Sequence, residues 1–463
     1  MFEDVSNLPA HAPINWKAQA DRFVEYIRQE SNGVMHRLPN GHVHFTAFLE
    51  GEGQELITYG AITLGQLLRG EDVESLLPSL ADYFQDDYGI YQNRIGDRRS
   101  EYWYLMYVNA LAASITRLAL ADDRGSVDRV YRSMVRLREL AHQIDYNFDD
   151  QGYDFEHGRP FTDNDAFRQP DTVGGYAFLM QFAYEMFGED SFRKEAEIGL
   201  DKYLSFAENP WYEIPSGAMA CLATARMNAT GSKFPMEKAI GFALDSTQGS
   251  LHKGKWGSEE INGLMRGWRG HTREEASSMA YSLETWVLLP YLLPVVRYEP
   301  SLAREIGKYA LHASCNARMF FSDQLPEGSQ ARPDLSAAVP YEALHKERDG
   351  HSPYAAGDFF GQKSIYGGAL TLWWGAIIRQ TSDPYVLGLN VTKTDFLNPS
   401  ADEIYLYYNP HGERVEIVDE IGDRAVDLYD FTTGTLLHKG VSGHATLVIE
   451  PDQALIVKWL PSA

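Results

Sequence analysis

The chain has 463 residues, of which 44% are hydrophobic, so it can bury a sizeable core in one large domain or in two to three smaller ones. Its 65 acidic and 41 basic residues give a net charge of −24, which argues against a nucleic-acid backbone or an anionic membrane surface as a partner. No apolar run reaches the roughly 18 residues of a membrane span. Residues 1–16 lack the basic and apolar regions of a secretory signal, so a cytoplasmic location is expected.

Helical periodicity extends over most of the chain and predicts about twelve helices. The predicted helices fall at about 15–30, 62–69, 73–85, 100–120, 126–144, 172–187, 190–207, 216–228, 233–248, 271–289, 298–318 and 365–380. Apolar helices that follow polar loops alternate with amphipathic helices. This alternation fits an inner ring of helices that are buried all round and an outer ring that exposes a charged face.

The pattern changes near residue 400, where short alternating runs are separated by turn residues. The runs include EIYLYYNP, RVEIVDE, AVDLYDF, HATLVIE and ALIVKWL. They predict a small antiparallel β-domain. The expected domains are therefore a helical one at 1–395 and a β-domain at 396–463.

The stretch 149–188 combines a dense polar loop with an apolar helix predicted at 172–187. Gly188 is suited to end that helix, because glycine takes the left-handed C-terminal conformation at little cost. Carboxylates delivered to the start of a buried helix lie near backbone N–H groups and the positive end of the helix dipole, which suits a substrate pocket. The alternative is a solvated loop in which Asp171 only caps the helix.

Three features resemble the six-hairpin glycosidase superfamily. They are the number of hairpins, the segments SEYWYLMYVNALAA, PDTVGGYAFLM and GHTREEASSMAYSLETW that lead into predicted inner helices, and the C-terminal order of YLYYNP, VDLYDFTTGTLL and VIEPDQALIVKWL. The resemblance implies an (α/α)6 toroid with a C-terminal β-domain. That superfamily includes hydrolases of neutral sugars and of uronides, and related toroids include polysaccharide lyases and sugar epimerases. The resemblance therefore implies carbohydrate chemistry without fixing the reaction.

Glycoside hydrolysis usually needs one protonated and one ionised carboxyl group. The acidic loops at 86–101, 150–171, 268–275 and 354–366 each precede an inner-type helix, so we expect them to converge at one end of the helical domain. The candidate catalytic residues are Asp165, Asp171, Glu274 and Glu275. Asp165 lies between two phenylalanines and is the expected proton donor, whereas Glu274 directly follows Arg273 and is the expected base.

Other polar and aromatic residues of these loops are candidates for binding the substrate. They are Arg94, His157, Tyr176, Trp268, Arg269, His271, Arg273, Asp358 and Tyr366. The segment 268–275 packs an aromatic ring, two cations, an imidazole and two acids into eight residues. An ordinary helix N-terminus, in which acids suit the dipole, is the alternative interpretation of that segment.

No metal or other cofactor is expected. The segment 145–156 superficially resembles a calcium loop, but its sixth position is Asp150 instead of glycine. The sequence contains no GxSxG and no phosphate-binding loop. Cys221 and Cys315 fall in apolar helical patterns and are expected to be buried thiols.

The leading prediction is a glycoside hydrolase that acts on small oligosaccharides, including ones that carry a uronic acid. A lyase or sugar isomerase, in which His271 and Tyr366 move protons, is the alternative chemistry. A non-catalytic carbohydrate-binding toroid is the alternative from a different functional class. The expected partner is a small carbohydrate, with no nucleic acid and no membrane, and assembly into a homo-oligomer is left open.

Overall fold

The protein is described by a computed structural model that covers residues 4–51, 53–213, 215–247, 249–266, 268, 276–357, 362–398, 400 and 402–462. Twelve α-helices and a C-terminal antiparallel sheet are present in this part of the chain. The predicted fold class is therefore confirmed. None of the described helices is long and apolar enough to cross a membrane.

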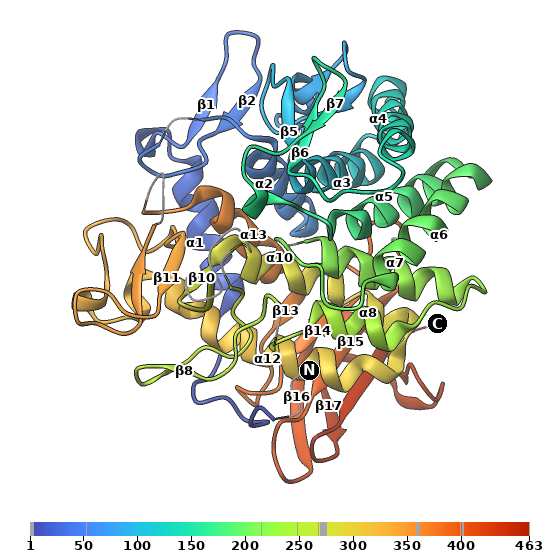
Figure 1. The fold of residues 1–463 in the computed structure, drawn as a ribbon. Helices are drawn as coiled ribbons and strands as arrows, with labels where there is room; N and C mark the ends of the chain where they lie inside the picture. The colour runs from blue at the N-terminus through green and yellow to red at the C-terminus, as the bar shows by residue number, and fades with distance from the viewer. Residues whose placement is uncertain are drawn as a thin grey trace.

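Six strongly buried helices form a closed inner ring (Figure 1). They are α2 (Leu56–Leu68), α3 (Tyr102–Ala119), α5 (Thr172–Phe187), α7 (Ser216–Ala229), α10 (Ser282–Leu292) and α13 (Ile365–Ile377). Each packs against the next in this order, and α13 packs against α2 to close the ring. All eleven residues of α10 are buried, because an inner helix is surrounded by other elements.

The outer helices are amphipathic and alternate with the inner ones along the chain. They are α1 (Trp16–Arg28), α4 (Arg124–Gln143), α6 (Asp190–Ser205), α8 (Met236–Ala243) and α12 (Ala303–Asn316), and α12 follows the short α11 (Val295–Tyr298). Only seven of the twenty residues of α4 are buried. Between α2 and α3 the alternation is interrupted by the 3-10 helix η2 (Leu77–Tyr83), which stands where the sequence predicts an α-helix at 73–85.

Small residues let the inner helices approach closely. A Cβ atom on Gly174 would lie 2.9 Å from the Cβ of Ala220 in α7, and one on Gly175 would lie 3.1 Å from the Cβ of Met106 in α3. The glycine pair at the start of α5 therefore serves packing on both sides. Gly188 ends α5 with a φ of 74°, as the sequence predicts.

Short strands form the loops at the N-terminal ends of the inner helices. The small sheets are β1–β2 (Met35–Arg37, Val43–Phe45), β3–β4 (Phe84–Gln85, Ile90–Tyr91), β5–β6–β7 (Arg99–Glu101, Gly152–Asp154, Arg159–Phe161), β8–β9 (Lys255–Trp256, Glu259–Glu260) and β10–β11–β12 (Met279–Tyr281, Ala343–His345, Tyr354–Ala356). The β5–β6–β7 sheet joins the loop before α3 to the loop before α5.

The C-terminal sheet has the strand order β13-β14-β15-β18-β16-β17, and every pair is antiparallel. Its strands are β13 (Ile378–Arg379), β14 (Gly388–Asn390), β15 (Glu403–Tyr408), β16 (Val415–Asp430), β17 (Leu436–Ile449) and β18 (Ala454–Pro461). The sheet begins directly after α13, earlier than residue 396, so the exact domain boundary stays a prediction.

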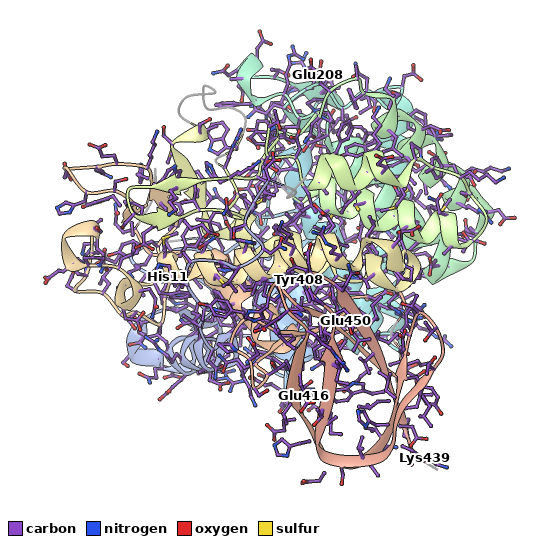
Figure 2. The ribbon with its side chains drawn as sticks, turned by 90° about the horizontal axis from the view of Figure 1, so that it is seen from below. His11, Glu208, Tyr408, Glu416, Lys439 and Glu450 are labelled. Atoms are coloured by element: carbon purple, nitrogen blue, oxygen red, sulfur yellow. The ribbon has the colours of Figure 1, made fainter. Side chains whose placement is uncertain are left out.

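The sheet is attached to the helical ring through α12 (Figure 2). A Cβ atom on Gly307 of α12 would lie 2.7 Å from the Cβ of Tyr408 in β15. Arg304 of α12 donates to a carboxylate oxygen of Asp452 at 2.6 Å. Figure 2 shows the β16–β17 hairpin, with Lys439, projecting away from the helices.

Candidate active site

A cavity of about 460 Å³ lies at the N-terminal ends of the inner helices. The residues that line it are Ala47, Phe48, Gly51, Glu55, Ile57, Arg94, Glu101, Trp103, Tyr104, Phe167, Tyr212, Glu213, Trp268, Tyr281, Leu283, Glu284, Glu342 and Tyr366. Each of the four acidic loops predicted to converge contributes at least one of these residues. The predicted convergence of the loops is therefore confirmed for their described parts.

Each acidic side chain of the cavity is placed by the start of a helix or by a short strand. Glu55 and Glu101 are the N-cap residues of α2 and α3. Glu284 is the third residue of α10, and Glu213 lies in the loop just before α7. Glu342 directly precedes β11. Because these helix starts belong to one closed ring, carboxyl groups that are far apart in sequence meet in one cavity.

Aromatic rings form much of the cavity wall. Trp268 lies beside two of them, with centroid distances of 5.2 Å to Phe167 and 6.1 Å to Tyr212. On another side, Phe48 meets Tyr366 edge to face at 5.3 Å. Aromatic side chains offer broad apolar faces with polar edges. Such walls suit the alternating apolar faces and hydroxyl rims of a sugar ring.

Glu213 and Glu284 both line the cavity, and the interaction between their carboxyl groups acts on the pKa of each. Burial raises the pKa of Glu213 well above its ordinary value, and the charges of Glu284, Glu101 and Asp171 raise it further. Burial also raises the pKa of Glu284. Two carboxyl groups in contact in a dry site cannot both ionise at low cost. Ionising both groups of the pair therefore costs more than ionising either one alone.

Glu101 accepts three hydrogen bonds from N–H donors. The Trp103 indole donates to Oε2 at 3.1 Å, and the amide of Gln169 donates to the same oxygen at 2.9 Å. The amide of Gln151 donates to Oε1 at 3.0 Å. An ionised carboxylate only accepts hydrogen bonds, so this surrounding matches the charged form of Glu101.

Glu55 forms an ion pair with Arg94, whose guanidinium donates to Oε1 at 2.6 Å and 3.0 Å. The Glu55 side chain is 8% exposed and that of Arg94 is 63% exposed. Both residues also line a second cavity of about 350 Å³, which shares Glu101 and Tyr104 with the first. The predicted substrate-binding residue Arg94 therefore stands where the two cavities meet.

Tyr366 donates a hydrogen bond to Oε1 of Glu342 at 2.8 Å. Burial raises the pKa of the Tyr366 phenol well above its ordinary value, and the charges of Glu342 and Glu284 raise it further. The phenol is therefore held protonated and acts as a hydrogen-bond donor.

Three other predicted site residues lie away from the cavity lining. Asp165 is in the 3-10 helix η3 (Asp165–Phe167), where its side chain is 86% exposed and pairs with Arg168 at 2.9 Å. This does not fit the aromatic pocket expected around Asp165, because the neighbouring Phe167 turns into the cavity while the aspartate points to solvent. Tyr176 is buried in α5, and His157 pairs with Asp154 at 2.9 Å.

The remaining predicted residues divide into two groups. Trp268 and Tyr366 line the cavity, and Asp171 is buried at the start of α5, where its charge acts on Glu213. Six others lie outside the described residues, and their places stay predictions. They are Arg269, His271, Arg273, Glu274, Glu275 and Asp358.

Sequence reasoning did not select Glu55, Glu213, Glu284 or Glu342. A signal was present for two of them. Glu284 is the one charged residue in the apolar run SLETWVLLPYL, and Glu213 stands between apolar neighbours in WYEIP. A lone acid in an apolar segment has to be buried with it, whereas a dense acidic loop remains solvated.

No protein-family model and no curated protein matches the chain. Among solved structures, a family 76 glycoside hydrolase from a bovine Bacteroides thetaiotaomicron strain is similar, with a TM-score of 0.51, 10% identity, and coverage of 78% of this chain and 77% of that one. Cellobiose 2-epimerase from Bacillus thermoamylovorans is also similar, with a TM-score of 0.50 and 8% identity, and the match covers 78% of this chain and 98% of that one. For an unsaturated glucuronyl hydrolase from Streptococcus agalactiae the TM-score is 0.43 and the identity 11%, and the match covers 81% of this chain and 94% of that one.

Because the sequence identities are this low, the comparisons show only that the fold is shared. The chain shares the fold of these two enzymes, so the (α/α)6 toroid that the sequence implies is confirmed as a fold. The activity has to be argued from the cavity itself.

Proposed function

We propose that the protein is a glycoside hydrolase that uses carboxyl groups of this cavity as acid and base. The observation that carries the proposal is the contrast between Glu213, whose pKa is raised by burial and by neighbouring carboxylates, and Glu101, whose carboxyl group accepts hydrogen bonds from three N–H donors. Acid–base hydrolysis of a glycoside requires one carboxyl group that can donate a proton and a second one in a different environment that acts as base or nucleophile.

In this proposal Glu213 donates its proton to the glycosidic oxygen as the bond to the anomeric carbon breaks. Glu101 acts on the other side, as the base for a water molecule or as the nucleophile. Glu284 keeps Glu213 protonated until the sugar binds, because the charge of one carboxyl group opposes ionisation of the other. The aromatic wall of Trp268, Phe167 and Tyr212 orients the sugar ring.

The alternative of a lyase or isomerase is less well supported. Such chemistry needs a base that removes a proton from carbon. Burial and Glu342 raise the pKa of Tyr366, which makes its phenol a poor base. The other expected base, His271, lies outside the described residues and stays a prediction. A non-catalytic carbohydrate-binding toroid would not need the raised pKa of Glu213.

The proposal is tested by Glu213→Gln and Glu101→Gln in a panel of oligosaccharides and aryl glycosides. Each variant should lower turnover by about a hundredfold or more. For Glu213→Gln the loss should be smaller with leaving groups that depart without a proton, because the missing function is protonation. The exposed Asp423 in β16 provides the control variant Asp423→Asn, which should keep full activity.

Two results would contradict the proposal. One is near-normal turnover in a folded Glu213→Gln or Glu101→Gln variant. The other is a product with ultraviolet absorbance from a carbon–carbon double bond, which elimination produces and hydrolysis does not.

A further inference from the structure

Glu101 stands at the position of a helix cap, but its carboxyl group does not cap the helix. It is the N-cap residue of α3, and its side chain accepts no hydrogen bond from the described N–H groups of that helix. The first N–H groups of a helix need acceptors from outside the helix. Here the backbone oxygen of Gln151 accepts the N–H of Tyr102 at 3.1 Å, and the side-chain oxygen of Gln169 accepts the N–H of Trp103 at 2.9 Å. Glu101 is thereby relieved of capping.

The side-chain amides of the same two glutamines turn their N–H groups to Glu101. Gln151 donates to its Oε1 atom at 3.0 Å, and Gln169 donates to its Oε2 atom at 2.9 Å. On the other side of each amide, a backbone N–H holds the oxygen. The N–H of Trp103 donates to Gln169 at 2.9 Å, and that of Asp163 donates to Gln151 at 3.0 Å. Because a backbone N–H only donates, it fixes the amide oxygen on its own side and the amide nitrogen on the side of Glu101.

Both glutamines are shielded from water. Gln169 is 0% exposed and Gln151 is 7% exposed. A buried amide whose oxygen and nitrogen both have partners loses two hydrogen bonds if it turns over, which is costly away from water. Gln169 is not among the described residues that line the larger cavity, so it acts on a ligand there through Glu101.

We propose that Gln151 and Gln169 are positioning residues that free Glu101 from capping α3 and aim its carboxylate into the cavity. The proposal rests on the proposed role of Glu101 as base or nucleophile. A carboxylate that is held at both oxygens before the substrate binds needs no reorganisation when the glycosidic bond breaks. The competing explanation is that the two glutamines only cap α3.

The two roles can be separated because glutamate has the shape of glutamine and keeps an acceptor oxygen. In Gln169→Glu the N–H of Trp103 still has its acceptor, whereas Glu101 loses one donor and gains a neighbouring negative charge. A role in capping alone predicts unchanged activity. The positioning role predicts that kcat at pH 7, for the aryl glycoside that wild type cleaves fastest, falls about tenfold or more, in line with a lost hydrogen bond to a charged group. KM should change less than kcat.

The pH–rate profile gives a readout that helix capping does not move. Two neighbouring carboxyl groups resist ionising together, so the acidic limb of the profile of Gln169→Glu should lie about one pH unit or more above that of wild type. The described titratable groups that also act on or respond to Glu101 are Glu213, Tyr104 and Tyr212, and the substitution leaves all three in place.

Two further variants make the comparison specific. Gln151→Glu removes the donor to the other oxygen of Glu101, so it should move the acidic limb in the same direction, and it decides if Gln169→Glu does not fold. The matched control is Gln181→Glu. Gln181 is a buried glutamine of α5 that donates to Glu185 at 3.3 Å, and neither is among the described residues of the cavity lining. This control should leave the acidic limb in place.

Thermal unfolding at pH 8 tests the contact without a substrate. Gln169→Glu should lower Tm because it places a second carboxylate against Glu101. Adding Glu101→Gln should restore part of the loss, because the like charges are then gone.

An acidic limb that stays in place in both folded glutamate variants, or that moves equally in Gln181→Glu, would overturn the proposal. A double variant that unfolds no higher than Gln169→Glu would do the same. Full activity of Glu101→Gln would instead refute the role of Glu101 in the hydrolase. If wild type cleaves no glycoside, the hydrolase is refuted and the thermal coupling decides whether the glutamines hold Glu101.

Discussion

The neighbouring carboxyl groups of Glu213 and Glu284 lead to a prediction that can be measured without knowing the substrate. Burial raises the pKa of Glu284 from 4.5 to about 7. Because the folded-state pKa is above the unfolded-state value, the protonated group contributes stability that is present at low pH and is lost as pH rises through about 7. At 1.36 kcal/mol per unit, the loss is about 3 kcal/mol by pH 8.5 or so.

In Glu284→Gln the side chain keeps its size but cannot ionise, so the variant should not lose this stability as pH rises. With an unfolding entropy of about 2.1 cal/mol/K per residue, 3 kcal/mol corresponds to about 3 °C in a chain of this length. Thermal unfolding should show the variant about 3 °C above wild type near pH 8.5 and within about 1 °C of it near pH 4. Asp423→Asn, which removes an exposed acid, should give no pH-dependent difference. The same offset at both pH values, or a less stable variant at high pH, would refute the reasoning.

Three further substitutions have defined outcomes. Gly152→Ala would place a Cβ atom 2.1 Å from a backbone oxygen of β5, so it should displace that strand, destabilise the protein and lower its activity. The control Gly412→Ala, whose Cβ would have no atom within 4 Å, should change neither stability nor activity. Arg226→Met removes one ion-pair partner of the Asp395 carboxylate, whose side chain is only 1% exposed. The free energy of unfolding, measured in urea, should therefore fall by about 3 kcal/mol. Tyr366→Phe should reduce turnover by about tenfold at most and leave the shape of the pH–rate profile unchanged, because the phenol is a donor and not a base. A larger loss with a shifted profile would assign Tyr366 to proton transfer.

The fold was predictable because its signal is repeated along the chain. Each inner helix is mostly apolar and each outer helix has one charged face, so the alternation is visible along most of the chain. The helix predicted at 172–187 has those bounds in the structure, including its end at Gly188. The interruption at η2 was not predictable in the same way, because a segment rich in leucine and tyrosine has the same periodicity in either helical form.

The cavity lies where the sequence predicted it, but the acids that line its described part were not the ones selected as catalytic, and the reason is physical. Charge density along the sequence identified the right loops, yet charges that crowd together in a loop stay solvated, as Asp165 does with its 86% exposed side chain. A catalytic acid needs a raised pKa, and burial is the main way to raise it. It is therefore expected where a single carboxyl group interrupts an apolar run, which describes both WYEIP and SLETWVLL. Which of these isolated acids meet depends on the closure of the ring. Glu213 and Glu284 reach each other because α7 and α10 are neighbours in the ring and begin at the same end, a relation that periodicity within either helix does not contain.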